Sequence, residues 1–499
     1  MDTCEIGSSV GQGRGAALML AVDDVSLPLR ESLCYYLSTP TVRREPVLTP
    51  SRDNPAAPDH VATHFYGTVL RDEGRFRMWY YACHWGEQAH EQAFCGNLVE
   101  GPICYAESDD GISWNKPALG QVALGGRKDN NAIALPDAMT EGAFVIKDAD
   151  DPDPRRRYKM VYEASSRGGT IRTATSPDGL QWTAGPEDPI GPTLLEPSSF
   201  YRFNGLYIVN GQCLGRSEGG HPQGRTGYAY VSPDFDRWPH ERCESFALAE
   251  PADPAARGGD KPYDQVHLGV GAASLGNAMV GLYCIWHNKP YPTEKDWFGM
   301  GTTVGDLGLV VSNDGLHFRE PVKGHVFLRH DESPVTPIPN ARYQTILCQA
   351  NGILNVGDET RIYHGRWANA EHIRDYYAEV ALATLPRDRW GALGLFPDAA
   401  TGSVWSMPVA LPPKGLDVAL NADGTAGMRV EIADARFVPL PRFSGDHAGV
   451  PAAPGGLACA VAWPGASLAE LGGRTVRFRV GFSRRDAAQP RLFAMYLRE

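Results

Sequence analysis

Short runs of aromatic and β-branched residues recur along the chain, each bounded by Gly, Pro or Asp. The clearest runs are Phe76–Tyr81, Tyr158–Tyr162, Leu206–Val209, Met279–Tyr283 and Arg361–His364. Such runs predict β-strands, and the 3.6-residue periodicity of amphipathic helices is nearly absent. The pattern of hydrophobic and polar positions therefore predicts an all-β protein.

A turn motif follows each run, with a hydroxyl residue first and an aromatic residue six positions later. Its copies are Ser108–Trp114, Ser176–Trp182, Ser232–Trp238, Ser312–Phe318 and a degraded fifth, Thr384–Trp390. Asp-Gly here is a hairpin signal, because Gly tolerates a positive φ and Asp can bond the backbone two residues on. Five copies predict five repeated units. Because radial repetition hides sheet edges, we expect a five-bladed β-propeller over residues 50–400, with an open sandwich as the alternative.

The hydrophobic pattern changes beyond this region. Pro408, Pro412 and Pro413 interrupt regular pairing, so residues 401–414 are expected to form a linker. Further on, Met428–Ile432 and Val476–Val480 alternate at period two, as half-buried antiparallel strands do. We expect a small C-terminal β-sandwich over residues 415–499 and an N-terminal extension over residues 1–49.

The composition and charge of the chain indicate which kinds of binding partner to expect. The 499 residues carry a formal net charge of −12 without a basic cluster, so nucleic acid is not an expected partner. The ten cysteines contain no CxxC pair, and the apolar run Ala16–Val22 is too short for a signal peptide or a membrane span. We expect a cytoplasmic protein with reduced thiols and no membrane partner, and the sequence leaves its oligomeric state open.

The innermost strands of a propeller line its central channel, so candidate chemistry is expected there. Counting back from the turn before each apolar run selects His64, Glu141, Glu196, His267 and Gln349. Polar groups on apolar strands are costly to bury without partners, so together they indicate a hydrogen-bonding pocket. Two alternatives are that some are solvated loop residues, or that a one-residue slip in register turns them to the other face.

Two carboxyl groups that flank a glycosidic bond can hydrolyse it, one as acid and one as base or nucleophile. Glu141 and Glu196 are the first candidates, and Asp59, at the mouth of the first unit, is a third. Near the same mouth, Trp85, His364 and Arg366 follow apolar strands and are candidates for sugar binding. The histidines show no metal-binding spacing, so we expect no metal site and no required cofactor, although a structural or channel calcium ion is compatible with the sequence.

The segment Glu196–Tyr207, the order of the units and the trailing sandwich resemble the five-bladed propeller glycosidases, a clan that includes arabinanases, β-xylosidases, invertases and levansucrases. Gly67–Val69, Met78–Tyr80 and Arg157–Met160 look similar to a less characterised branch of that clan. The resemblance implies that Glu196 is the general acid and that Glu141 tunes it. The base or nucleophile of the first blade has no clear counterpart, and only Asp59 could replace it.

We therefore expect a glycoside hydrolase, or a related glycosyl-transferring enzyme, that acts on a small glycoside or oligosaccharide. In this hypothesis His64, His267 and Gln349 bind sugar hydroxyls. Two alternatives stay open, because a fold does not determine a function. One is a non-catalytic carbohydrate-binding propeller, and the other is an enzyme of specialised metabolism that reuses the glycosidase scaffold.

Overall fold

The protein is all-β, as the hydrophobic pattern predicts. The computed structural model describes residues 4–5, 16–86, 98–137, 139–164, 170–191, 193, 195–216, 222–249, 252–253, 264–287, 304–338, 344–368, 376–484 and 489–498. Single 3-10 turns interrupt the strands at Pro154–Arg156, Thr425–Gly427, Pro441–Phe443, Gly445–His447 and Leu468–Leu471. Across these ranges, no helix has the length and apolar character needed to cross a membrane.

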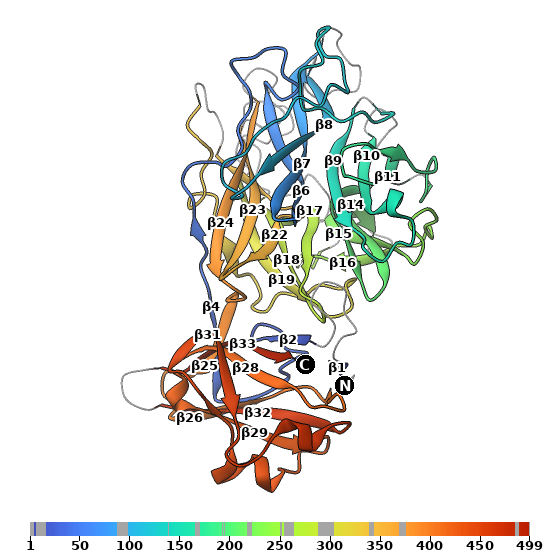
Figure 1. Ribbon diagram of the computed structural model, residues 1–499. Helices are drawn as coiled ribbons and strands as arrows, with labels where there is room; N and C mark the ends of the chain where they lie inside the picture. The colour runs from blue at the N-terminus through green and yellow to red at the C-terminus, as the bar shows by residue number, and fades with distance from the viewer. Residues whose placement is uncertain are drawn as a thin grey trace.

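Three antiparallel sheets come first in the upper part of the molecule (Figure 1). The first contains β6 (Ala62–Asp72), β7 (Arg75–Trp85) and β8 (Leu98–Ser108) in that order. The second contains β9 (Glu141–Lys147), β10 (Tyr158–Ala164), β11 (Thr170–Ser176) and β12 (Thr183–Ala184). The third contains β13 (Glu196–Phe203), β14 (Leu206–Arg216), β15 (Pro222–Ser232) and β16 (Cys243–Phe246).

A larger sheet follows and combines two groups of strands. The first group is β17 (Gln265–Ser274), β18 (Met279–His287), β19 (Val304–Ser312) and β20 (Val326–Leu328). The second is β21 (Ile346–Cys348), β22 (Ile353–Val356), β23 (Glu359–Ala368) and β24 (Tyr377–Pro386). One parallel bridge between Gly305 and Ile346 joins them. On the outside of β24 lies β5 (Thr41–Val42), which comes from the start of the chain.

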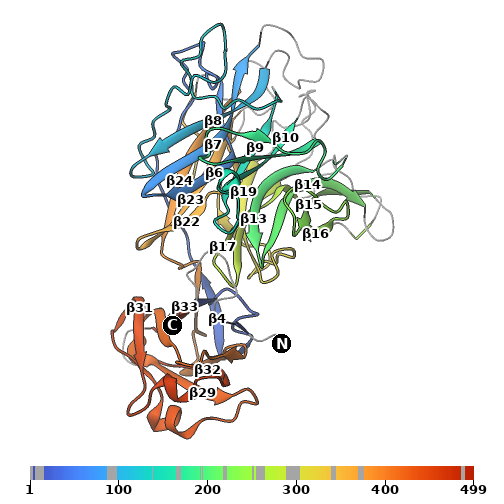
Figure 2. The same cartoon turned by 45° about the vertical axis from the view of Figure 1, so that its right-hand side comes forward.

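The first strands of successive groups lie against one another. β6 contacts β9, β9 contacts β13, and β13 contacts β17. β22 contacts both β17 and β6, so the series of contacts returns to its start. Figure 2 shows β6, β9, β13 and β17 gathered in the middle of this part, with β16 further out. Residues on these first strands therefore share one central region.

The repeated turn motif forms the expected hairpin and also joins neighbouring groups of strands. The hydroxyl of Ser108 accepts a hydrogen bond from the N–H of Gly111 at 2.8 Å, and the copies at Ser176 and Ser312 make the same bond. The glycine carbonyl of each turn then accepts a bond from the adjacent group. The donors are Tyr363 Oη to Gly111 (2.8 Å), Trp79 Nε1 to Gly179 (2.9 Å) and Tyr201 Oη to Gly315 (2.8 Å).

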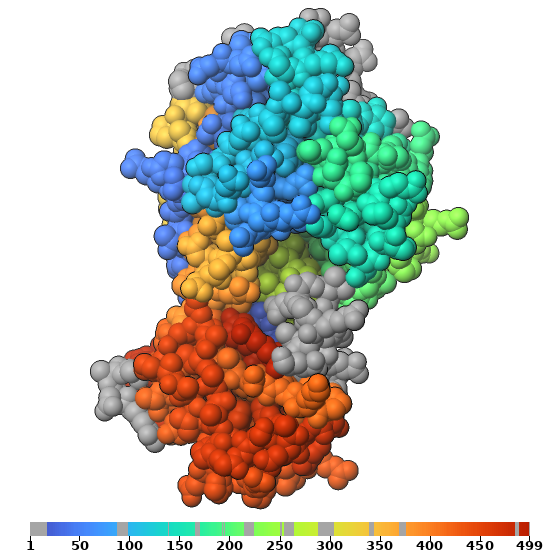
Figure 3. Space-filling model, in the orientation of Figure 1, coloured from blue at the N-terminus to red at the C-terminus, as the bar shows by residue number. Residues whose placement is uncertain are grey.

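Two further sheets form the lower part of the molecule in Figure 1 and the orange and red surface in Figure 3. One sheet contains β1 (Cys4–Glu5), β27 (Val409–Ala410), β32 (Thr475–Ser483), β26 (Thr401–Trp405), β3 (Leu29–Glu31) and β29 (Met428–Asp434). The other contains β30 (Val450–Pro451), β31 (Gly455–Ala462), β28 (Asp417–Asp423), β33 (Arg491–Arg498), β25 (Gly391–Leu395), β4 (Leu33–Leu37) and β2 (Ala16–Leu20). Side chains from both sheets, among them Val430, Phe478, Leu420 and Met495, share one hydrophobic core.

The expected domain boundaries need correction. Residues 401–414 are not a linker, because β26 and β27 lie there and pair with β32. Pro412 and Pro413 come after β27, where a missing N–H ends a strand without disrupting it. The expected extension over residues 1–49 supplies β2, β3 and β4 to the lower sheets and β5 to the last central sheet. β25, within the expected propeller range 50–400, also belongs to the lower sheets.

Candidate active site

Four glutamates converge in the central region of the upper sheets. Glu141 and Glu196 are the first residues of β9 and β13, two strands that lie in contact. Glu163 on β10 is the cross-strand partner of Glu141. The carboxyl group of Glu163 interacts electrostatically with those of Glu141, Glu196 and Glu100, the last of which lies on β8. The structure thus brings together two of the predicted catalytic carboxyls and adds two more.

The surroundings of Glu163 favour the protonated form of its carboxyl group. Its Oε2 atom is buried and has no hydrogen-bond partner among the described residues. Burial raises the pKa of Glu163 well above the ordinary value, and the nearby charges of Glu141, Glu196 and Glu100 raise it further. Perturbation of this kind is typical of a general acid. Glu163 can therefore hold a proton at a pH at which an exposed carboxyl group is ionised.

Sequence reasoning missed Glu163 because it examined only the first strand of each unit. Glu163 lies on β10, the second strand of its sheet, near the end of an apolar run. A β-bulge between Val161 and Glu163 shifts the register of β10 against β9, and Glu163 pairs with Glu141 beyond it. A charged residue inside an apolar strand was the available signal, since such a residue is rarely buried without a function or a partner.

Glu196 has a different environment from Glu163. Gln212 on β14 is its cross-strand partner, and Gln212 Nε2 donates to Glu196 Oε2 at 2.7 Å. The other end of the same amide, Gln212 Oε1, accepts from the backbone N–H of Leu268 at 2.8 Å. The carboxyl group of Glu196 therefore accepts a hydrogen bond from a side chain of the protein. Glu163 Oε2 accepts no hydrogen bond within the described ranges.

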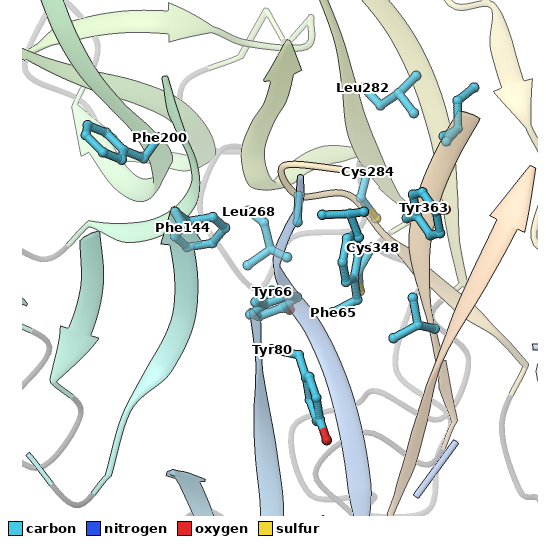
Figure 4. Close-up of a cluster of buried hydrophobic side chains, with 14 of the residues drawn as sticks. Phe65, Tyr66, Tyr80, Phe144, Phe200, Leu268, Leu282, Cys284, Cys348 and Tyr363 are labelled. Carbon is cyan, nitrogen blue, oxygen red and sulfur yellow. The ribbon is translucent and has the colours of Figure 1, made fainter. Parts of the chain in front are cut away.

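Aromatic and imidazole rings form a second part of this central region. Tyr66 interacts with Glu196 and Glu141, and its hydroxyl lies 3.4 Å from His267 Nε2. His64 packs against Tyr66 and Trp367, with ring centroids 4.7 and 4.3 Å apart. Figure 4 shows Tyr66 in the middle of the buried group that surrounds it. The structure therefore brings His64 and His267 together through Tyr66 and Trp367.

Both of these histidines are neutral bases in the folded protein. His64 is 1% exposed and His267 is 4% exposed. Burial lowers the pKa of each imidazole well below its usual value, and the Arg225 guanidinium, 3.0 Å from His267 Nδ1, lowers the pKa of His267 further. Neutral rings of this kind can hydrogen-bond hydroxyl groups without adding charge to the site.

Gln349 follows β21 and is held by the protein itself. Its Nε2 donates to the carbonyl oxygens of His267 and Gly269, at 2.9 and 2.8 Å. Both carbonyls belong to a β-bulge in β17. The amide NH2 group of Gln349, a predicted sugar contact, therefore binds backbone carbonyl oxygens instead.

Asp59 lies in a separate cluster on the other face of the first sheet. It is fully buried, forms an ion pair with Lys116, and accepts from Tyr80 Oη at 2.9 Å. Tyr81, the next residue on β7, stacks on His64 with a centroid distance of 4.5 Å. Because successive strand residues face opposite sides, Tyr80 and Asp59 face away from the ring cluster. These partners favour a structural role for Asp59, and its role as base or nucleophile stays a prediction.

His364 and Arg366 share the face of β23 opposite to Trp367. His364 Nε2 lies 2.8 Å from Ser333 Oγ, and burial together with the Arg366 charge lowers the pKa of His364 to about 3. Arg366 is 1% exposed and pairs with Glu379, which is fully buried. This closed network leaves neither group available to a sugar.

Trp85, 37% exposed at the end of β7, borders residues 87–97, which lie outside the described residues.

Within the described ranges, no group of three or more His, Cys, Asp and Glu side chains is arranged to hold a metal ion.

No protein-family model and no curated protein matches this sequence. Among solved structures, the chain is similar to a glycosyl hydrolase from Bacteroides ovatus, at 13% identity and a TM-score of 0.43 over 71% of this chain and 95% of that one. It is similar to a β-1,2-mannobiose phosphorylase from Listeria innocua, at 15% identity and a TM-score of 0.42 over 71% and 96%. It is also similar to a family 43 arabinoxylan arabinofuranohydrolase from Bacillus subtilis, at 12% identity and a TM-score of 0.37 over 88% and 96%. Likenesses this distant assign neither a family nor an activity.

Proposed function

We propose that the protein is a glycoside hydrolase, or a closely related glycosyl-transferring enzyme, that acts on a small glycoside or oligosaccharide. The observation that carries the proposal is the buried carboxyl group of Glu163, whose Oε2 has no partner among the described residues, beside the carboxyl groups of Glu141 and Glu196. Glycosyl transfer needs one carboxylic acid and one carboxylate in the same site, and mutual repulsion keeps the two in different protonation states.

The two environments suggest which group has which role. Glu163 would give its proton to the oxygen of the leaving group, since burial keeps its carboxyl group protonated. Glu196 would be the base or nucleophile, because the N–H of Gln212 favours its ionised form. This assignment moves the acid from Glu196, where the family resemblance puts it, to Glu163. Glu141 would keep the pKa of Glu163 high, and His64 and His267 would bind sugar hydroxyls.

The fold proposed with this function is a five-bladed β-propeller followed by a β-sandwich. A hollow of 310 Å3 supports it, because each of the five strand groups supplies lining residues, among them Val69, Val145, Phe200, Ala272 and Asn351. Val145 and Phe200 lie nearer the C-terminal ends of β9 and β13, whereas Glu141 and Glu196 begin these strands, which suggests a central axis with the carboxyl groups at one end. The proposed setting is cytoplasmic, with a carbohydrate as the partner.

Release of sugar from a panel of aryl glycosides and natural oligosaccharides tests the proposal. We expect activity in the native protein and a loss of turnover of at least ~100-fold in Glu163→Gln and Glu196→Gln, within the usual range for acid–base catalysis. Glu359→Gln is the matched control, because Glu359 is an exposed residue on β23. Near-normal turnover in Glu163→Gln would remove that residue from the mechanism.

A non-catalytic carbohydrate-binding protein is the second candidate, favoured by the Lys116 ion pair that occupies Asp59. Calorimetry with the same panel separates the two, because sugar binding without turnover would support the binding protein. An enzyme of specialised metabolism with the same scaffold would show neither sugar release nor binding within the panel.

A further inference from the structure

One side-chain amide ties Glu196 to the neighbouring group of strands. Gln212 is 9% exposed, and it donates from Nε2 to Glu196 while accepting at Oε1 from the N–H of Leu268. A backbone N–H can only donate, so the oxygen of the amide must face Leu268. The NH2 group is thereby directed at Glu196, and the orientation of Gln212 follows from its partners.

The N–H of Leu268 is itself held by an unusual backbone conformation. Leu268 and Gly269 have positive φ angles of 65° and 75°, inside the β-bulge between His267 and Val270. A non-glycine residue rarely adopts this conformation unless its surroundings impose it. Gln349 stabilises the bulge, because its Nε2 donates hydrogen bonds to the carbonyl oxygens of His267 and Gly269.

Close packing of two glycines leaves the bulge little room to move. A Cβ atom on Gly269 would lie 2.6 Å from the carbonyl carbon and oxygen of Gly211, the residue before Gln212. A Cβ atom on Gly211 would lie 2.2 Å from the carbonyl oxygen of Glu196. The backbones of β13, β14 and β17 therefore meet directly behind the Glu196 side chain.

We propose that Gln212 is a positioning residue that orients Glu196 and holds it ionised, and that the β17 bulge with Gln349 fixes Gln212 in turn. The inference rests on the proposed function, because it takes Glu196 as the ionised carboxylate of the site. Titratable groups that face Glu196 include Glu163 on β10, Tyr66 on β6 and Cys348 on β21. Burial raises the pKa of each, so Glu163, Tyr66 and Cys348 are uncharged neighbours of Glu196 near neutral pH, whereas the N–H that Gln212 donates favours the ionised form of Glu196.

The direct test measures the carboxyl group of Glu196 rather than turnover. Side-chain carboxyl signals of 13C-labelled glutamate are titrated by NMR, and the Glu196 signal is assigned by its absence in Glu196→Gln. In Gln212→Met we expect the pKa of Glu196 to rise by about one to two pH units, as for the loss of a hydrogen bond to a charged group. The acidic limb of the kcat/KM profile should move upward with it, because the reaction needs the ionised form.

Asn210 offers a matched control on the same strand. Its Oδ1 accepts from the N–H of Val270 at 2.9 Å, so it contacts the same bulge through a residue that does not donate to Gln212. Asn210→Met should leave the titration of Glu196 unchanged, because the two Gln349 bonds still hold the carbonyls on either side of Leu268. If Gln212→Met does not fold, Gln212→Leu removes the same donor without adding a charge, and it too must raise the pKa of Glu196.

An unchanged pKa of Glu196 in the folded Gln212 variant would overturn the inference. An equal rise in Asn210→Met would also overturn it, since general loosening of the bulge would then explain the effect. A rise confined to Gln212 variants, in a protein without activity on any glycoside, would support the positioning role and refute the proposed function. The two claims therefore fail separately.

Discussion

Replacement of Arg366 by Met should strongly destabilise the central sheets. The Arg366 side chain donates to Ser333 Oγ at 2.9 Å and to the carbonyl oxygens of Arg43 and Arg44 at 2.8 and 3.0 Å. It also lies 3.4 Å from Glu379, which is fully buried. Methionine fills a similar volume but supplies no charge, so the donors left to Glu379 among the described residues would be the N–H of Thr336 and the hydroxyl of Tyr377.

The expected loss follows from the buried charge that remains. Removal of one partner of a buried ion pair costs about 3–5 kcal/mol in free energy of unfolding. Urea unfolding, followed by fluorescence, measures this loss in Arg366→Met, and a second substitution, Glu379→Gln, should recover part of it. Arg329→Met is the matched control, because Arg329 and its partner Asp331 are both largely exposed and should contribute little.

A loss below about 1 kcal/mol, the value of an ordinary exposed pair, would refute the structural role of Arg366. So would a folded Arg366→Met protein with normal stability and a raised KM, because that result would return Arg366 to the sugar-binding residues. The experiment thus decides between the sequence prediction for Arg366 and the network that the structure assigns to it.

Three other predictions follow from described contacts. In the proposed mechanism, kcat/KM of the native protein should fall as the pH rises through the raised pKa of Glu163, and the matching limb of the pH–rate profile should be lost in Glu163→Gln. His364 has a pKa of about 3 in the folded protein, so the unfolded chain takes up a proton first as the pH falls. Protonation of His364 in the unfolded chain should lower the free energy of unfolding by about 2 kcal/mol between pH 7 and pH 5. Urea unfolding at both pH values measures this loss, which should be absent in His364→Gln. Tyr201→Phe removes the bond to the Gly315 carbonyl at 2.8 Å and should cost about 1 kcal/mol, whereas Val322→Ala, at an exposed apolar residue, should change stability little.

The strands and hairpins could be predicted from sequence because their signals are local. Aromatic and β-branched runs bounded by turn residues fix where the strands lie, and Ser108 makes the bond expected of its motif. Glu141 and Glu196 could be found because both begin a first strand. Glu163 could not be found by the same count, since a β-bulge sets its pairing and a bulge has no reliable sequence signal.

Pairing between distant segments could not be predicted for a related reason. β2 pairs with β33 and β5 pairs with β24, and in each case the partners lie hundreds of residues apart. A strand's hydrophobic pattern shows which face is buried but not which strand lies beside it. The role of Asp59 depended in the same way on Lys116, a partner that no local spacing identifies.

The last central sheet is completed by β5, and the first hairpin turn is held by Tyr363 of β23. The pairing of β5 with β24 and the hydrogen bond of Tyr363 both connect the earliest strands of the upper part with the latest. During synthesis on the ribosome, residues 41 and 42 therefore cannot pair until β24 has emerged. A nascent chain that stops short of β24 has its first sheet exposed on one side. We expect such truncated chains to be captured by chaperones, and chains that include β24 to become resistant to proteases.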